Sequence, residues 1–154
     1  MQRINKELTD KLAALAKKSS RKRTIHRFHK EDSDLLQRML NVMEPTTYVQ
    51  PHKHEDPNKR EVFIILSGRA LFLEFDNDGS VTDRELLSPA DGSYGAEVQP
   101  GIYHTILALE SGTVCYELKD GPYNPDDDKC FAPWAPAEGE EGAQEYLKKL
   151  FDLQ

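Results

Sequence analysis

The chain has 154 residues and a formal net charge of −7, with 38% hydrophobic and 31% charged residues. This length suits one domain with its own hydrophobic core, and no apolar run approaches the ~20 residues of a membrane-spanning helix. The first 20 residues lack the apolar centre of a signal peptide, so we expect a cytoplasmic protein. Two cysteines do not make a disulfide framework.

The charge is unevenly distributed along the chain. Residues 1–30 carry ten Lys or Arg and two Asp or Glu. Residues 31–154 carry ten Lys or Arg and 25 Asp or Glu. A basic N-terminal segment on an otherwise acidic chain can bind nucleic acid or recruit an anionic small molecule. It can also pack on the acidic remainder of its own chain or of a second subunit. Because non-specific nucleic-acid binding depends on net basic surface, we expect no nucleic-acid partner.

A first helix is predicted over residues 3–18, because apolar residues recur there at steps of three or four with charged residues between them. These residues are Ile4, Leu8, Leu12 and Leu15. Residues 19–23 break the pattern, and residues 24–30 are interpreted as an extended connector.

A second helix is predicted over residues 33–43. Asp32 or Ser33 can cap it and Pro45 ends it. Its apolar face is formed by Leu35, Leu36, Met39, Leu40 and Met43.

From residue 46 onward, short β-branched and aromatic runs alternate with turn residues, which is typical of strands in an antiparallel sandwich or barrel. The expected strands cover residues 46–50, 61–66, 69–75, 81–87, 93–99, 103–109 and 113–119. The Pro- and Gly-rich residues 121–142 are predicted to be a loop that follows the surface, and residues 140–151 to be a closing helix.

This pattern divides one domain into three parts. Residues 1–45 form a helical and basic segment that packs on the barrel, residues 46–120 form the barrel, and residues 121–154 form the tail and closing helix.

Three histidines carry the clearest chemical signal. His52 and His54 are one residue apart, so on a strand their side chains point to the same side. His104 opens a later strand behind a Pro-Gly turn. If these strands line a barrel, the three imidazoles can meet at one point. Imidazoles suit a first-row divalent metal, and three of them leave positions open for water or substrate.

Glu61 opens the strand after the His-x-His pair and is a candidate fourth ligand, with a salt bridge to Arg60 or Lys59 as the alternative. The predicted cofactor is therefore one divalent metal ion held by the three histidines and Glu61. These residue types do not decide between Fe, Mn, Zn, Ni and Cu.

Candidate substrate contacts lie in the basic segment. Arg21, Arg23 and Arg27 can hold a phosphate or carboxylate through paired N–H donors, although a solvated connector explains them equally well. Tyr103, beside His104, is a further candidate, and strand tyrosines more often serve packing.

The metal residues resemble the two motifs of the cupin superfamily. In the first motif, His-x-His is followed by Glu and, after six further residues, by Gly. The matching residues are His52, His54, Glu61 and Gly68, with a longer gap than usual before the Glu. In the second motif, Pro100-Gly101 precedes His104, and Ala108 stands where Asn is usual.

Three stretches are similar to WbuC-type cupin-fold metalloproteins. They are residues 20–23 with residues 28–29, residues 40–54, and residues 117–123 followed by Phe-Ala-Pro-Trp-Ala-Pro at residues 131–136. The resemblance implies a jelly roll with a bound divalent metal and an association with surface-polysaccharide (O-antigen) biosynthesis. It supplies no reaction.

We therefore expect a mainly β, single-domain cupin jelly roll, an antiparallel barrel or sandwich with N-terminal helices and a short C-terminal helix. The favoured function is a metal-dependent enzyme, of isomerase, epimerase or dioxygenase type, acting on a sugar, sugar nucleotide or other small anionic compound. Two alternatives stay open: a metal-independent sugar-nucleotide isomerase or epimerase with a histidine base, and a non-enzymatic metal- or ligand-binding cupin. We expect a homodimer and no membrane partner.

Overall fold

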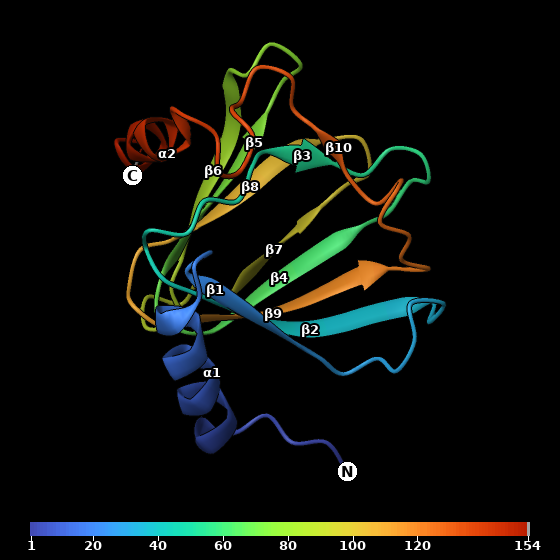
Figure 1. Cartoon of the computed structure of the whole chain (residues 1–154), viewed down its shortest axis with the longest axis vertical. Helices are drawn as coiled ribbons and strands as arrows, with labels where there is room; N and C mark the ends of the chain where they lie inside the picture. Colours follow the sequence, from blue (N-terminus) through green and yellow to red (C-terminus); the bar gives the residue numbers. More distant parts are fainter. Residues whose placement is uncertain (154) are drawn as a thin grey trace.

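The computed structural model describes residues 1–153, in which ten strands and two helices are found (Figure 1). The strands form two antiparallel sheets. Sheet A has the order β1-β2-β9-β4-β7, and sheet B has the order β10-β3-β8-β5-β6. The elements are α1 (Lys6–Lys18), β1 (Arg23–Arg27), β2 (Leu36–Met43), β3 (His52–Lys53), β4 (Glu61–Ser67), β5 (Ala70–Phe75), β6 (Val81–Leu87), β7 (Gly95–Val98), β8 (Tyr103–Ala108), β9 (Thr113–Asp120), β10 (Cys130–Phe131) and α2 (Ala143–Phe151).

The two sheets pack face to face around an apolar core. Because side chains alternate along a strand, every second residue of β4, β5 and β8 points into this core. Its buried members are Met43, Phe63, Ile65, Ala70, Phe72, Leu87, Val98, Ile106, Ala108 and Cys115. The sheets therefore form a sandwich whose interior is apolar at one end and, as described below, polar at the other.

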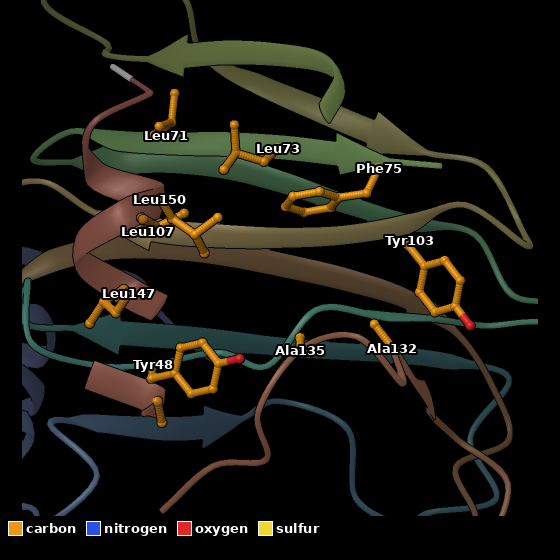
Figure 2. Packing of buried hydrophobic residues seen from close by; sticks show 11 residues of the cluster. Tyr48, Leu71, Leu73, Phe75, Tyr103, Leu107, Ala132, Ala135, Leu147 and Leu150 are labelled. Atoms are coloured by element: carbon orange, nitrogen blue, oxygen red, sulfur yellow. The ribbon is translucent and has the colours of Figure 1, made fainter. Parts of the chain in front are cut away.

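Each sheet is also covered on its outer face. The amphipathic α1 packs on sheet A, where Leu12 and Ala16 meet Leu40 and Val42 of β2. The tail and α2 pack on sheet B, where Leu147 and other apolar residues of these segments cover the outward side chains of β5 and β8 (Figure 2). Asn5 caps α1 by accepting a hydrogen bond from the Leu8 N–H.

The prediction of a second helix over residues 33–43 is wrong, because this segment contains the eight-residue strand β2. β2 is buried on both faces. Met43 points into the sandwich core, whereas Leu40 and Val42 lie under α1. A strand covered on both faces loses the polar–apolar alternation that normally identifies it, and its apolar run then imitates the spacing of a helix.

Three smaller expectations also need correction. The connector at residues 24–30 is largely β1, which pairs with β2 in sheet A. Residues 46–50 form no strand, and the regular structure begins at His52 with the two-residue β3. The tail, expected to be a loop throughout, contributes β10, which pairs with β3.

The expected mainly β antiparallel architecture with a short C-terminal helix is confirmed, as a sandwich with one N-terminal helix among the described residues rather than several. The strands expected between residues 61 and 119 are all present, with small shifts at their ends. Neither helix in residues 1–153 is long and apolar enough to cross a membrane.

Candidate metal centre

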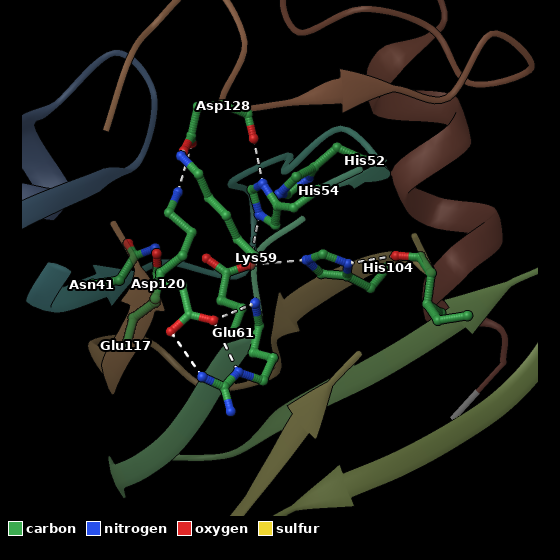
Figure 3. Close-up of polar contacts among 12 residues, drawn as sticks. Asn41, His52, His54, Lys59, Glu61, His104, Glu117, Asp120 and Asp128 are labelled. Atoms are coloured by element: carbon green, nitrogen blue, oxygen red, sulfur yellow. Dashed lines mark hydrogen bonds and ion pairs between the residues drawn. The ribbon is translucent and has the colours of Figure 1, made fainter. Parts of the chain in front are cut away.

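The structure brings the three predicted histidines and Glu61 together between the sheets (Figure 3). His52 on β3 and His104 on β8 are direct partners in sheet B. Glu61 is the first residue of β4 in sheet A and points toward them. His54 follows β3 and completes the group. The four side chains thus come from both layers of the sandwich.

The four residues form a compact and buried set of possible ligands. One donor atom from each lies within 4.8 Å of the others. The Glu61 Oε2 atom is 3.1 Å from His54 Nε2 and 3.0 Å from His104 Nε2. All four residues are at most 3% exposed. Three imidazoles and one carboxylate are ligand types suited to a first-row divalent metal.

Main-chain carbonyls set the orientation of all three imidazoles. The Nδ1 atom of His52 lies 2.9 Å from the Gln50 carbonyl oxygen, and that of His104 lies 3.0 Å from the Ile102 carbonyl oxygen. His54 Nδ1 contacts the carbonyl oxygen of Asp128. Because a carbonyl only accepts hydrogen bonds, each Nδ1 atom must carry the proton. In the neutral ring the Nε2 lone pair is then free for a metal, as in metal-ligating histidines.

This arrangement leaves lone pairs facing one another at the centre. The Nε2 atoms of His54 and His104 both face the acceptor oxygen of Glu61, and His52 Nε2 is buried without a hydrogen-bond partner. Several acceptors that converge in a buried space need a cation between them, since unpaired buried polar atoms are destabilising. A divalent ion fits this requirement, so the residues present are suited to hold one.

The charge states of the group agree with this arrangement. Burial lowers the pKa of His52 well below its usual value, so its imidazole is neutral. Burial alone would raise the pKa of Glu61, but the close His104 and His54 imidazoles and the charge of Lys119 outweigh it and keep that pKa well below the usual value. Glu117, behind Glu61, has a pKa raised to about 8 by burial and by the charge of Glu61.

A buried ion-pair cluster fixes the residue whose carbonyl orients His54. Asp128, whose carbonyl oxygen contacts His54, accepts hydrogen bonds from Lys59 Nζ at 2.9 Å and from Lys119 Nζ at 2.5 Å. All three charged residues are buried. Sequence reasoning missed this cluster, because Lys59 and Asp128 are 69 residues apart and no local pattern links them.

A cavity of about 340 Å³ lies beside the metal centre, on the inner face of sheet A. Its walls include Gln50, whose carbonyl holds His52, and Glu117 and Asp128, which adjoin Glu61 and His54. A ligand in this cavity would therefore lie against the residues that surround the proposed ion.

The candidate substrate residues separate into two groups. Arg21, Arg23 and Arg27 all line the cavity. Tyr103 does not, because it lies on the opposite face of β8 from His104, in the apolar cluster with Phe75 and Trp134 (Figure 2). Its position is that of a packing residue.

Solved structures share the fold of this chain. A CapF structure with the inhibitor 3-isopropenyl-tropolone matches 70% of this chain and 30% of its own, with a TM-score of 0.58 and 23% identity. KdgF from Halomonas sp. matches 68% of this chain and 82% of its own (TM-score 0.52, 15% identity). Oxalate decarboxylase from Lactobacillus farciminis in its formate complex matches 71% of this chain and 35% of its own (TM-score 0.50, 17% identity).

These similarities and the buried His/Glu group define a cupin-fold protein with a candidate metal site. A family model described as "Domain of unknown function (DUF6016)" matches residues 4–87, and the chain belongs to this family. No curated protein sequence matches the chain. The chain spans less than a third of the CapF structure, so the similarity to CapF describes the fold.

Proposed function

We propose that this protein binds one divalent metal ion through His52, His54, Glu61 and His104 and acts on a small, oxygen-rich anionic compound in the adjacent cavity. One observation carries the metal proposal. Main-chain carbonyls hold the Nδ1 atoms of the three histidines, so that all Nε2 lone pairs converge on the Glu61 carboxylate without donors between them.

The donor set of three nitrogens and one oxygen suits Fe, Mn, Zn, Ni or Cu, and cellular availability decides among them. A divalent ion bound there would act as a Lewis acid toward a carbonyl or hydroxyl oxygen of the substrate. The protein's own part is to hold the four ligands and to keep the site away from bulk water, since all four are buried.

The substrate class rests on the walls of the cavity. Arg21, Arg23 and Arg27 supply guanidinium groups suited to phosphate or carboxylate. A neighbour in the cupin fold is described as a capsular polysaccharide assembling protein from Staphylococcus aureus, and another as an oxalate decarboxylase. Together with the WbuC-type resemblance, these descriptions support a sugar, sugar nucleotide or similar anion, and a role in surface-polysaccharide biosynthesis.

Elemental analysis tests the metal site. Protein purified without added metal is expected to contain about one divalent ion per chain. His104→Ala is expected to lose the ion, because the three remaining ligands bind it too weakly. His26→Ala is the matched control, since His26 lies outside the cluster. Wild-type protein that takes up no metal, even when Fe, Mn, Zn, Ni and Cu are each supplied, would contradict the proposal.

A metal-independent isomerase or epimerase is the second candidate, because His52 is neutral and its Nε2 atom has no partner, as a general base requires. Turnover of a sugar nucleotide that persists after complete chelation would favour it. Tight ligand binding by the metal-loaded protein with no turnover would instead favour a non-enzymatic cupin.

A further inference from the structure

We propose that the cavity takes a ligand with two recognised ends, an oxygen-bearing end at the metal centre and a carboxylate or phosphate end at Arg21 and Arg23. We further propose that Glu138 of the tail occupies this anion site in the ligand-free protein and leaves when the ligand enters. The metal end rests on the function proposed above, whereas the anion end does not depend on it.

The geometry of the arginine pair shows which chemistry it binds. Arg21 donates from Nε and Nη2 to the two oxygens of Glu138, at 2.7 Å each. Arg23 donates from Nη2 to one of the same oxygens at 2.6 Å. Two parallel N–H donors on one carboxylate are the arrangement by which arginine recognises carboxylates and phosphates. The pair therefore already holds an anion, supplied by the protein itself.

Arg23 is placed firmly before any ligand arrives. Its Nη1 atom donates to the Thr47 hydroxyl at 3.0 Å and to the Tyr48 carbonyl at 2.8 Å. Its side chain is 9% exposed, whereas that of Arg21 is 58% exposed. Arg23 thus provides a fixed point of recognition, and Arg21 closes on the anion from the solvent side. Such preorganised donors reduce the entropy that binding must overcome.

Glu138 is held at this position mainly by the two arginines. It lies in the tail, next to Gly139, whose backbone has a φ of +89°. Glu138 and Arg21 line both the 340 Å³ cavity and a second cavity, of about 590 Å³. Departure of the Glu138 side chain would therefore vacate the arginine pair and connect the two spaces.

The strand order of sheet A relates this anion site to the metal centre. Arg23 is on β1 and Glu61 on β4, and β2 and β9 lie between them. Adjacent strands are ~4.8 Å apart, so β1 lies about 14 Å from β4 across the sheet, and Arg23 is also about 20 Å from Glu61 along the strands, because Arg23 is level with Thr113 and Glu61 with Lys119. Arg23 lines the cavity together with Glu117 and Asp128, which adjoin Glu61 and His54, so an elongated ligand in the cavity can reach both ends. A cavity of about 340 Å³ is near the lower limit for small-molecule sites.

The remaining walls favour a negatively charged ligand. Lys129 lines the cavity and forms no ion pair with any residue in the described part of the chain. Two buried wall atoms, His29 Nε2 and Asn41 Oδ1, lack hydrogen-bond partners, which is typical of a surface that a polar ligand completes.

Phosphate binding to the EDTA-treated full chain tests the anion end, by equilibrium dialysis with labelled inorganic phosphate at low ionic strength. Glu138→Gln removes the internal anion and is expected to bind phosphate about tenfold more tightly than wild type, equivalent to about 1.4 kcal/mol. Arg23→Met is expected to lower the affinity by at least about tenfold, because it removes the fixed donors.

Asp120→Asn is the matched control. Asp120 also pairs with an arginine, since Arg60 donates to it from Nε at 2.9 Å and from Nη2 at 3.3 Å, but this pair does not line the cavity. The variant frees a surface arginine elsewhere and is expected to leave phosphate affinity unchanged. An increase as large as that of Glu138→Gln would mean that any freed arginine binds phosphate, which would overturn the proposal.

The folding and the phosphate affinity of Glu138→Gln decide whether the proposal stands. If Glu138→Gln folds and binds phosphate no better than wild type, Glu138 is only a tether for the tail and the proposal fails. If that variant does not fold, Arg21→Met replaces it, because its exposed side chain tolerates substitution, and unchanged phosphate affinity there also overturns the proposal. Metal content of the same preparations is measured separately, so failure of the metal site and failure of the anion site are distinguishable.

Discussion

At the scale of single residues, one of the three histidines depends on a group that is distant in the sequence. Gln50 and Ile102 each lie two residues before the histidine that they hold, so those two rings are oriented locally. His54 instead depends on Asp128, 74 residues further on. Lys59 and Lys119 fix Asp128 in turn, and burying two ammonium groups is favourable only when such partners are retained.

Lys59→Met is therefore expected to weaken metal binding. The substitution keeps the length of the side chain but removes one of the two cations on Asp128, so the carbonyl that orients His54 is less firmly placed. Loss of such an outer partner lowers metal affinity by about 10–100-fold. Chelator competition with Co²⁺ or Zn²⁺ measures the change. Lys53→Met, at a cation that pairs with Glu55 instead, is the control and should bind metal as wild type does.

The Glu138 pair predicts a dependence of stability on pH. Hydrogen bonds from Arg21 and then Arg23 lower the pKa of Glu138 to about 2. Because an unpaired glutamate has a pKa of about 4.3, this contribution to stability is complete above that value and is lost as the pH falls through about 2. Glu138 is partly exposed, so solvent screening limits it to about 1 kcal/mol or less.

Urea unfolding of wild type and Glu138→Gln at several pH values measures this contribution. The wild type is expected to be the more stable protein at pH 6, and the difference is expected to vanish near pH 2. A difference that stays constant between these values would show that the ion pair does not contribute.

At the scale of secondary-structure elements, β2 shows where sequence reasoning fails. The strand β4 alternates between buried and half-buried residues and was predictable, whereas β2 is apolar toward both the core and α1. The helical period of Leu36, Met39, Leu40 and Met43 arises by chance from two strand faces. Only the docking of α1, a tertiary contact, distinguishes the two interpretations.

Leu40→Ala is expected to destabilise the protein by about 2–5 kcal/mol, because it leaves a cavity between β2 and α1. Leu35→Ala is the control, because Leu35 is 80% exposed and its loss should change stability by less than about 0.5 kcal/mol. Equal effects of the two substitutions in denaturant unfolding would contradict the position of α1 on sheet A.

The tail is the second element that the sequence did not resolve. Its Pro- and Gly-rich composition indicates a loop, and this is largely correct. Composition does not reveal that Asp128 holds His54 or that Glu138 holds two arginines, because each contact joins residues more than 70 apart. The histidines and Glu61 were predictable because two of them share a short motif and all four match a known pattern of ligand types.

At the scale of the whole molecule, the four candidate metal ligands come from both sheets, so a bound ion would connect them. Glu61 belongs to sheet A, and His52 and His104 belong to sheet B. An ion that binds only the folded chain stabilises it by about 2.7 kcal/mol when free metal is 100 times the dissociation constant. For a chain of this size, EDTA is therefore expected to lower the melting temperature by roughly 5–10 °C.

Differential scanning calorimetry with and without EDTA measures this shift. His104→Ala serves as the control, because without a complete ligand set its melting temperature should not respond to chelator. A wild-type melting temperature unaffected by EDTA, in protein shown to contain metal, would mean that the ion does not connect the sheets.

A homodimer is the remaining prediction at this scale. Exposed apolar side chains lie at one side of sheet A, at Ile25 on the edge strand β1 and at Leu36 at the start of β2. Sedimentation velocity is expected to show a species of about twice the 17.6 kDa chain mass. A single species at the mass of one chain would contradict this expectation.

The contact between His54 and Asp128 also has a consequence for how the protein is made. A nascent chain that has emerged only to residue 127 already contains all four ligand residues, but it lacks the carbonyl that orients His54 and the strand β10 that pairs with β3. Since domains fold as units once their contacts are available, the ligand set is completed late in synthesis. Metal insertion is therefore expected to follow translation of nearly the whole chain, and proteolytic removal of the tail should release the ion.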